Sequence, residues 1–490
     1  MSSQKPVIVW FRQDLRLSDN PALSQAVESG APVIPVYVLD EETPRTESGD
    51  WRLGGAQRWW LHHSLERLEE SLRDKGAGLV LRSGPADEVI PALVQETQSQ
   101  AVFWNRCYEP FAVTRDRAIK SALDEAGVAV HSFGANLIHE PWTLQTKAGE
   151  PFKVFTPFYK AALAKGEPAE PLSPPKRIAA ATLPQGDRLS DWDLLPQKPD
   201  WAGGLRDTWT PGETGARGRL AGFIGNTLGH YKKDRNRPDL PHSSRLSPHL
   251  HWGEVSPRQI WHSVRRHQHE SGGGKIDSAA EAFLREVIWR EFSYNLLFHW
   301  PELPARNWKP EFDDFPWRDD AKALRAWQRG QTGFPIVDAA MRELYATGWM
   351  HNRSRMIVAS FLTKDLLIHW REGEAWFWDT LVDADLANNS ASWQWTAGSG
   401  ADAAPYFRIF NPVSQGERFD PEGAYVRQWV PELRGLPDGY IHKPWDAPAD
   451  VLERAGVRLG KDYPERLVDH KQARRRALDA YETIKKDKAA

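Results

Sequence analysis

Residues 7–39, VIVWFRQDLRLSDNPALSQAVESGAPVIPVYVL, contain two apolar, β-branched runs separated by a helical pattern. The runs Val7–Phe11 and Val33–Leu39 are short and continuously apolar, which is typical of strands buried on both faces of a sheet. Between them, Pro21–Glu28 has the apolar spacing of a helix. A strand, a helix and a second strand in this order predict a right-handed crossover between parallel strands.

The same alternation continues to about residue 133. It predicts a doubly wound parallel sheet with helices on both faces, which is an α/β domain. The loop after the first run, RQDLRLSDN, lacks the GxGxxG fingerprint, so we do not expect a dinucleotide in this domain. The further strands are expected at Leu79–Arg82, Ala101–Asn105 and Val128–Phe133, and the further helices at Ala56–Lys75, Ala86–Gln98 and Arg115–Ala126.

The pattern changes after this domain. Residues 134–204 include GEPAEPLSPPKRIAAATLPQ, which is rich in proline and lacks periodicity, so we expect a long linker. We therefore divide the chain into an α/β domain at 1–133, a linker at 134–204 and an all-helical domain at 205–490. The helices expected in the last part are Ala216–Thr227, Ser278–Phe298, Ala321–Arg329, Pro335–Thr347, Arg353–Trp370 and Glu374–Val382.

Composition narrows the class of protein. The 490 residues carry 63 basic and 66 acidic side chains, so any nucleic-acid surface is a local patch. Cys107 is the only cysteine, and His62–His63 lack a metal-ligand spacing, so we predict neither disulfides nor a metal site. No apolar run reaches the roughly 18 residues that span a bilayer, which favours a soluble, cytoplasmic protein without a membrane segment.

Residues 381–412, LVDADLANNSASWQWTAGSGADAAPYFRIFNP, combine polar and aromatic side chains. Asp383, Asp385 and Asn389 stand among apolar positions, where unpartnered carboxylates and amides are costly. Trp393 and Trp395 add flat faces that suit an aromatic heterocycle. The segment therefore indicates a ligand, although a polar loop beside two core tryptophans explains the composition equally well.

Two further groups of residues suit binding chemistry. Ser243, Ser244 and Ser247 surround Arg245 at an expected helix start, which suits an anion, although plain N-capping has the same pattern. On the expected helix Ser278–Phe298, a carboxylate, an indole and a guanidinium share one face. These are Glu286, Trp289 and Arg290, and an ordinary salt-bridge stripe beside a core tryptophan is the alternative.

Five motifs resemble the DNA photolyase/cryptochrome family, in the order found in that family. The resemblance covers residues 7–480 and is greatest for bacterial class III photolyases, with class I photolyases as the alternative. The motifs are WFRQDLRLSDNPAL (10–23), SSRLSPHLHWGEVSPRQIW (243–261), FLREVIWREF (283–292), TGFPIVDAAMRELYATGWMHNRSRM (332–356) and WQWTAGSGADAAPYFRIFNP (393–412).

This resemblance implies a light-driven DNA repair enzyme with FAD in an all-helical domain. Reduced FAD (FADH−) would absorb light and donate an electron to a cyclobutane pyrimidine dimer flipped out of UV-damaged DNA. The dimer ring would then split, and the electron would return to the flavin. An antenna, methenyltetrahydrofolate, is implied as well, with Glu109 and the Trp51–Gln57 loop as contacts. We expect a monomer with no obligate protein partner.

The resemblance also implies a role for single residues. Asn389 would lie beside the flavin N5, Arg355 would pair with Asp383, and Trp289 and Trp395 would sandwich the lesion. Glu286 would hydrogen-bond to the pyrimidines, and Trp393, Trp370 and Trp317 would carry electrons from the surface to the flavin. The implied FAD contacts are Tyr231, Ser243, Ser244, Arg245, Leu246, Ser247, Arg290, Arg355, Asp383, Ala384, Asp385 and Asn389; the implied DNA contacts are Arg235, Glu286, Trp289, Asn352, Arg353, Trp395 and Arg408.

Two other functions fit parts of the pattern. A photosensory cryptochrome would share the flavin site without repairing DNA, but it often has a long C-terminal extension, whereas this chain ends in KKDKAA. A light-independent DNA-binding protein with a vestigial pocket would bind no chromophore. Among repair enzymes, the (6-4) branch typically has a histidine directly after His351, and Asn352 at that position favours cyclobutane dimers.

Overall fold

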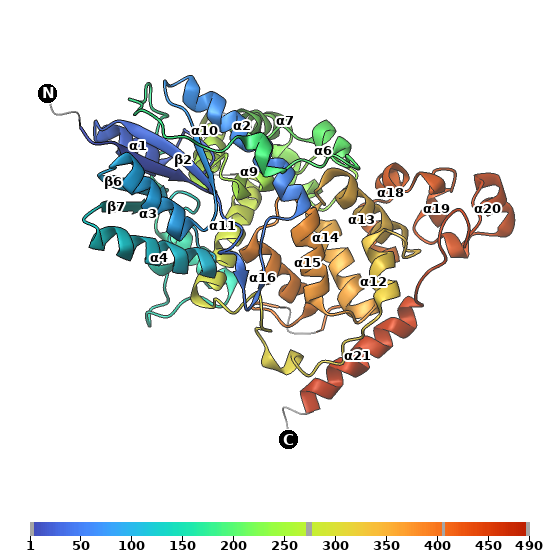
Figure 1. The fold of residues 1–490 in the computed structure, drawn as a ribbon. Helices are drawn as coiled ribbons and strands as arrows, with labels where there is room; N and C mark the ends of the chain where they lie inside the picture. Colours follow the sequence, from blue (N-terminus) through green and yellow to red (C-terminus); the bar gives the residue numbers. More distant parts are fainter. Residues whose placement is uncertain (1–3, 271–276, 404–406, 487–490) are drawn as a thin grey trace.

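The computed structural model describes residues 4–270, 277–403 and 407–486, so residues 404–406 of the last motif lie outside the described residues. Figure 1 shows a parallel sheet with its helices on one side of the molecule and a larger helical part on the other. The predicted fold class, α/β followed by all-helical, is confirmed.

The sheet has five parallel strands in the order β5-β2-β1-β6-β7. Strand β1 is central, and the chain winds outward from it in both directions, as predicted for a doubly wound sheet. Strands β1, β2 and β6 have the predicted bounds, and β5 and β7 each begin one residue later than predicted. The bounds are β1 Val7–Phe11, β2 Val33–Leu39, β5 Val80–Ser83, β6 Ala101–Asn105 and β7 Ala129–Phe133.

Helices cover both faces of this sheet. On β1, Val7 and Phe11 pack with residues of α1 and α2, whereas Ile8 and Trp10 pack with residues of α3 and α4. Burial on both faces explains why the strands are continuously apolar rather than alternating. The helices are α1 Pro21–Glu28, α2 Gly55–Arg73, α3 Ala86–Thr97 and α4 Pro110–Glu125, and the last begins five residues earlier than predicted.

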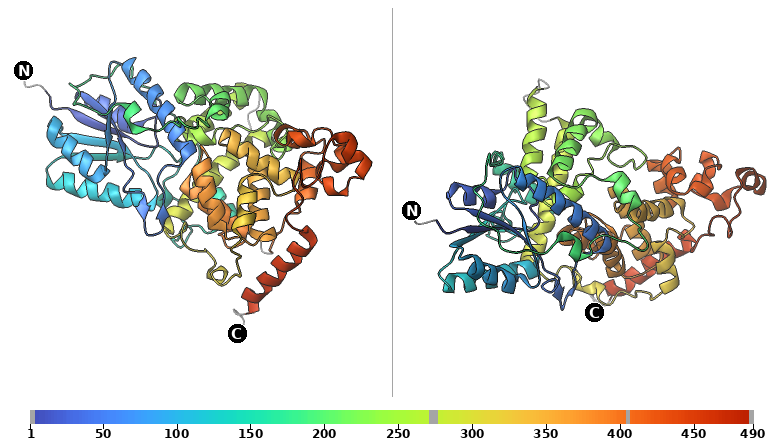
Figure 2. Two further views of the ribbon diagram at one scale, coloured as in Figure 1. Left: turned by 45° about the vertical axis from the view of Figure 1, so that its right-hand side comes forward. Right: turned by 45° about the horizontal axis from the view of Figure 1, so that its top comes forward.

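The remaining helices form the second part, and α21 lies along its edge (Figures 1 and 2). Within the described residues, no helix is long and apolar enough to cross a membrane. The main helices are α7 Glu213–Asn226, α8 Tyr231–Asp234, α9 Ser247–His251, α10 Pro257–Glu270, α11 Ser278–His299, α12 Ala321–Gln328, α13 Pro335–Thr347, α14 Asn352–Ser360, α15 Trp370–Thr380, α16 Leu386–Ala397, α17 Pro412–Phe419, α18 Ala424–Trp429, α20 Ala449–Ala455 and α21 His470–Lys486.

The prediction of one helix over Arg353–Trp370 is wrong. Helix α14 ends at Ser360, a single π turn follows, and Leu367 adopts a left-handed conformation (φ 56°) before α15 begins. Buried polar groups in this turn bond outside the helix, because the Lys364 Nζ donates to the Ala397 carbonyl (2.7 Å). The Asp365 carboxylate likewise pairs with the His470 Nδ1 (2.6 Å), so the turn is fixed by its partners.

The predicted linker contains a helix that its sequence did not indicate. Helix α5, Phe155–Ala164, packs against α11, and Phe158 contacts Phe292 with ring centroids 5.3 Å apart. The Asn295 side chain, which is buried, also donates to the Phe152 carbonyl (2.9 Å). This stretch is therefore part of the helical core.

A buried carboxylate joins the two parts of the molecule. Glu254 is fully buried and accepts hydrogen bonds from the Trp60 Nε1 (3.0 Å) and Ser64 Oγ (2.7 Å) of α2. It also accepts from the Gly212 backbone N–H (2.7 Å) and pairs with His249. Hydrogen-bond donors from the α/β domain and from the helical domain thus share one acceptor, the Glu254 carboxylate.

Glu254→Ala should lower the free energy of unfolding by about 3 kcal/mol or more, because several buried donors lose their acceptor. Urea denaturation of the full chain measures this change. Glu66→Ala is the matched control, since Glu66 is half exposed and forms only surface ion pairs. Equal midpoints for both variants would contradict a structural role for the Glu254 network.

Candidate functional site

The polar segment singled out from the sequence begins helix α16 and is not a loop. Asp385 is the N-cap residue, and its carboxylate accepts from the backbone N–H and the side-chain amide of Asn388 (both 2.8 Å). The Tyr294 hydroxyl also donates to it. Burial alone would raise the pKa of Asp385, but hydrogen bonding to His251 and the positive charge of Arg290 hold that pKa below its usual value.

The predicted ion pair between Arg355 and Asp383 is present. The Arg355 Nη2 lies 2.8 and 3.0 Å from the two Asp383 carboxylate oxygens, and the carboxylate is almost fully buried. The Arg355 Nε donates to the Met350 carbonyl (2.8 Å), which fixes the guanidinium. The next carbonyl, that of Ala384, accepts from the Gln57 Nε2 of α2 (2.8 Å). The segment 383–385 is therefore held from several helices.

Asn389 is buried one turn into α16. Its Nδ2 donates to the Glu374 carbonyl of α15 (3.0 Å), so the side-chain oxygen points elsewhere. The Glu374 carboxyl is fully enclosed and accepts from the Ser390 hydroxyl. Burial raises the pKa of Glu374 to about 8, although the Ser390 bond and the charge of Arg371 act in the opposite direction. A neutral carboxylic acid thus lies beside Asn389 at pH 7.

The protonation of Glu374 predicts a pH dependence of stability. The usual pKa of this carboxyl is 4.5, which applies to the unfolded chain, and burial raises the pKa to about 8 in the folded chain. Unfolding between these values releases a proton, so stability falls as the pH rises through this window. Glu374→Gln cannot ionise and should give a shallower decline. Thermal unfolding at several pH values in the window measures it, and identical slopes for variant and wild type would contradict the prediction.

The serine-rich turn differs from its prediction in one respect. Helix α9 spans only five residues, and Arg245 just before it has a left-handed conformation (φ 50°). The polar groups of this turn are therefore the serine hydroxyls rather than the start of a long helix. The Arg245 guanidinium lies over the Trp349 ring (4.6 Å), and the Trp349 Nε1 contacts the Ser247 Oγ (3.2 Å). A hollow of about 540 Å³ borders Ser243 and Ser244. Leu246 beside them is buried.

Tyr231 belongs to the short helix α8 that precedes this turn. It is buried against Phe223 and Phe283, with ring centroids 5.8 and 5.3 Å away. Burial raises the pKa of its hydroxyl above the usual value, so the phenol stays neutral. The Arg235 guanidinium lies 5.6 Å from the Tyr231 ring and extends toward α11.

Helix α11 presents Glu286 and Trp289 on one face, as predicted. The Arg235 Nη1 lies 2.5 Å from the Glu286 carboxylate, and both side chains are partly exposed. The Trp289 ring stacks on Phe155 of α5, with centroids 3.5 Å apart and planes 9° apart. Arg290, the third predicted member, instead donates to the Asn136 carbonyl of the linker (2.7 Å).

Several arginines lie near Arg353 of helix α14. Burial and the positive charges of Arg408, Arg235 and Arg418 lower the pKa of Arg353 to about 10. The Arg353 Nη2 donates to the Asn236 side chain (2.8 Å). Asn352, Arg408 and Arg418 are exposed, so the group forms a local basic patch on a chain with net charge −3. Sequence reasoning missed Arg418, which lies outside the motifs.

The tryptophans predicted as a relay lie around helix α15. Trp393 is buried between Trp327 and Phe377, with centroids 6.1 and 5.0 Å away. Its ring rests directly on Gly373, where a Cβ atom would overlap the indole. One turn earlier, Trp370 is fully buried at the start of the helix.

A residue that the sequence did not indicate lies near two of these tryptophans. The His369 ring lies 5.5 Å from Trp370 and 5.0 Å from Trp317. Burial and the nearby charge of Arg371 lower the pKa of His369 to about 4, so the imidazole is neutral at pH 7. The sequence could not show that this histidine lies near both tryptophans.

If Trp393 carries electrons to a flavin, as the family resemblance implies, Gly373→Ala should slow light-driven reduction of bound FAD, because the added methyl group displaces the Trp393 indole. Gly225→Ala is the matched control, since a Cβ there meets no atom within 4 Å. Absorbance at the flavin band during illumination measures the rate. Equal rates in both variants would show that the packing of Trp393 on α15 does not affect reduction of the flavin.

The two predicted antenna contacts have different partners in the structure. Glu109 is buried and accepts from the Gln13 Nε2 (2.7 Å). In the Trp51–Gln57 loop, Trp51 packs edge-on against Trp378 (5.4 Å), and the Gly55 N–H donates to the Asp379 carboxylate (2.9 Å). This loop therefore contacts α15.

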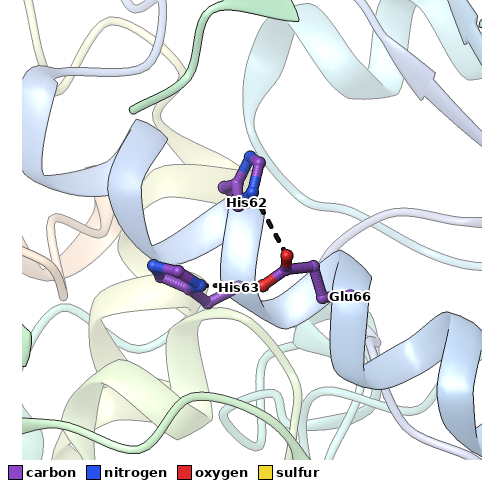
Figure 3. Close-up of side chains that lie close together, drawn as sticks. All are labelled: His62, His63 and Glu66. Carbon is purple, nitrogen blue, oxygen red and sulfur yellow. Dashed lines mark hydrogen bonds and ion pairs between the residues drawn. The ribbon is translucent and has the colours of Figure 1, made fainter. Parts of the chain in front are cut away.

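Two histidines of α2 converge on one carboxylate (Figure 3). The His62 Nε2 and His63 Nδ1 lie 3.4 and 2.9 Å from the Glu66 oxygens, and the three ligand atoms lie within 4.8 Å of one another. Neighbours at i, i+3 and i+4 form such ion pairs without a metal. The absence of a metal site stays a prediction.

Comparison with known proteins identifies the family. Residues 283–483 match the FAD binding domain of DNA photolyase, and residues 7–176 match the DNA photolyase domain. A deoxyribodipyrimidine photo-lyase of Agrobacterium fabrum is 54% identical over 98% of both chains, and Cryptochrome-1 of Arabidopsis thaliana is 40% identical over 96% of this chain and 70% of its own.

Solved structures agree with this assignment. The crystal structure of a bacterial class III photolyase from Agrobacterium tumefaciens is 53% identical and superposes over 99% of both chains with a TM-score of 0.94. The fold, the motifs and the overall identity point the same way. The chain belongs to the DNA photolyase/cryptochrome family.

Proposed function

We propose that this protein is a cyclobutane pyrimidine dimer photolyase that repairs UV-damaged DNA with light and reduced FAD. The observation that carries the proposal is the joint presence of Glu286 and Trp289 on one partly exposed face of helix α11, which packs against helix α16, where Asn389 is buried. The similarity to a photo-lyase and to a class III photolyase over nearly the whole chain supports it.

The residues present fit FAD. The hollow at Ser243 and Ser244 offers hydroxyls to phosphates, and the Arg355–Asp383 pair offers a fixed, neutralised charge near the ring system. Bound in reduced form, FAD supplies the electron that light makes available. The neutral Asn389 amide would lie beside the flavin N5 and hydrogen-bond to it.

We infer that the DNA is held by the basic patch. Arg235, Arg353, Arg408 and Arg418 would contact phosphates, and Asn352 would lie beside the backbone. Trp289 and Trp395 would stack on the extruded pyrimidines, at about 1–3 kcal/mol per base. The Glu286 carboxylate, now paired with Arg235, would then accept a hydrogen bond from a pyrimidine.

The remaining predictions belong to this proposal. Trp393, Trp370 and Trp317 would carry electrons from the surface to reduce oxidised flavin, with the His369 ring near the last two. The electron used in repair would return to the flavin from the split pyrimidines. Methenyltetrahydrofolate would serve as the antenna, and mass identification of the released chromophore tests it. A monomer, together with domains at 1–133 and 205–490 joined by 134–204, completes the proposal.

A photosensory cryptochrome is the second candidate, because Cryptochrome-1 of Arabidopsis thaliana shares 40% identity over 96% of this chain. Such a protein would photoreduce its flavin without splitting dimers. Oligothymidylate containing dimers, illuminated with the reduced holoprotein, separates the two. Recovery of thymine absorbance supports the photolyase, and no recovery with fully reduced flavin contradicts it.

Glu286→Gln should weaken binding of the dimer-containing strand by about tenfold, because a charged acceptor is lost from the lesion contact. The matched control is Glu281→Gln, an exposed position on the same helix. Fluorescence anisotropy of a labelled strand measures both affinities in the dark. Should the two variants bind alike, Glu286 does not contact the lesion.

A further inference from the structure

We propose that Asp402 and Phe155 form a brace that sets the positions of Trp289 and Trp395 relative to each other. The two residues are positioning residues, since they act through the tryptophans. The inference rests on the proposed function, in which these indoles stack on the extruded dimer. The brace adds a linker helix and a turn after α16 to the machinery of lesion binding.

The first half of the brace is the stack of Phe155 on Trp289. Phe155 is buried, and its ring is nearly parallel to the indole, at a centroid distance of 3.5 Å. It thereby covers one face of Trp289. Phe292 meets both rings edge-on, at 5.8 and 5.7 Å, and closes the pair from the side. A base can stack only on the remaining face of Trp289, and the position of that face depends on Phe155.

The second half of the brace is Asp402. Its Oδ2 accepts from the Phe155 backbone N–H (3.2 Å), which is the first N–H of helix α5. The N-cap residue of that helix is Val154, whose side chain cannot accept a hydrogen bond, so Asp402 supplies the missing cap from 247 positions away. The Asp402 carbonyl accepts from the Trp395 Nε1 (3.1 Å).

Asp402 therefore bonds both to Phe155, which stacks on Trp289, and to Trp395. The carboxylate holds the helix start that carries Phe155, and the carbonyl holds the indole of Trp395. Asp402 adopts a left-handed conformation (φ 52°), which directs its side chain and its carbonyl to different partners. Loss of the carboxylate would release α5 from the turn and let Phe155 and Trp289 shift together.

The conformation of Asp402 offers a matched pair of variants. Asp402→Asn keeps an acceptor oxygen and tolerates the left-handed region, whereas Asp402→Gly tolerates the same region without any acceptor. Their difference isolates the hydrogen bond to Phe155. A second pair, Phe155→Leu and Phe155→Tyr, removes or keeps the aromatic stack on Trp289.

The experiment uses the full-length protein with reduced FAD, kept in the dark. Anisotropy gives the affinity for labelled oligothymidylate with and without one dimer. Asp402→Gly and Phe155→Leu should bind the dimer strand about tenfold more weakly, equivalent to the loss of about one stacked base. Asp402→Asn and Phe155→Tyr should stay within about twofold of wild type. Affinity for the undamaged strand should change little in all four, because the basic patch is intact.

Three results would overturn the brace. Dimer affinity of Asp402→Gly and Phe155→Leu equal to wild type is one, and equal losses in Asp402→Gly and Asp402→Asn is another. Equal losses for damaged and undamaged strands would show a general structural defect. A wild-type protein that does not distinguish the two strands would instead contradict the proposed function, so the two failures are separable.

Discussion

Buried charge in an apolar interior requires a partner, and the segment 383–385 shows how this requirement shapes the helical domain. Asp383 is paired with Arg355 of α14, and Asp385 accepts from Tyr294 of α11 while it caps α16. The carbonyl between them, on Ala384, is held by α2. Removal of one partner would leave a costly buried charge, so these contacts fix where α16 begins relative to three other helices.

The position of α16 in turn determines the site. Asn389 and Trp393 are buried residues of this helix, and Trp395 is partly exposed near its end. Helix α15 packs along it through Gly373, which lets the Trp393 ring lie close to the helix that starts with Trp370. A single helix thereby carries residues proposed for the flavin, the electron path and the lesion. Arg408 of the basic patch borders the same hollow as Trp395 near the end of this helix.

Sequence alone predicted the regular elements well, because burial on both faces of a sheet leaves a continuous apolar run. It also predicted the Arg355–Asp383 pair, through resemblance to a family. It failed where tertiary partners override local pattern, as at Leu367 and Lys364, which break the helix expected to Trp370. Contacts such as Asp402 with Phe155, or His369 between two tryptophans, join residues whose proximity no local pattern encodes.

The most direct test of this account is the FAD content of Asp383→Asn. The account predicts that the wild-type chain binds one FAD, and that the variant, with Arg355 left without its counter-charge, retains native helical content but loses most of the flavin. Asp124→Asn, an exposed position, serves as the control and should keep it. An unchanged FAD affinity in Asp383→Asn, measured by equilibrium dialysis, would contradict the central role of the buried pair.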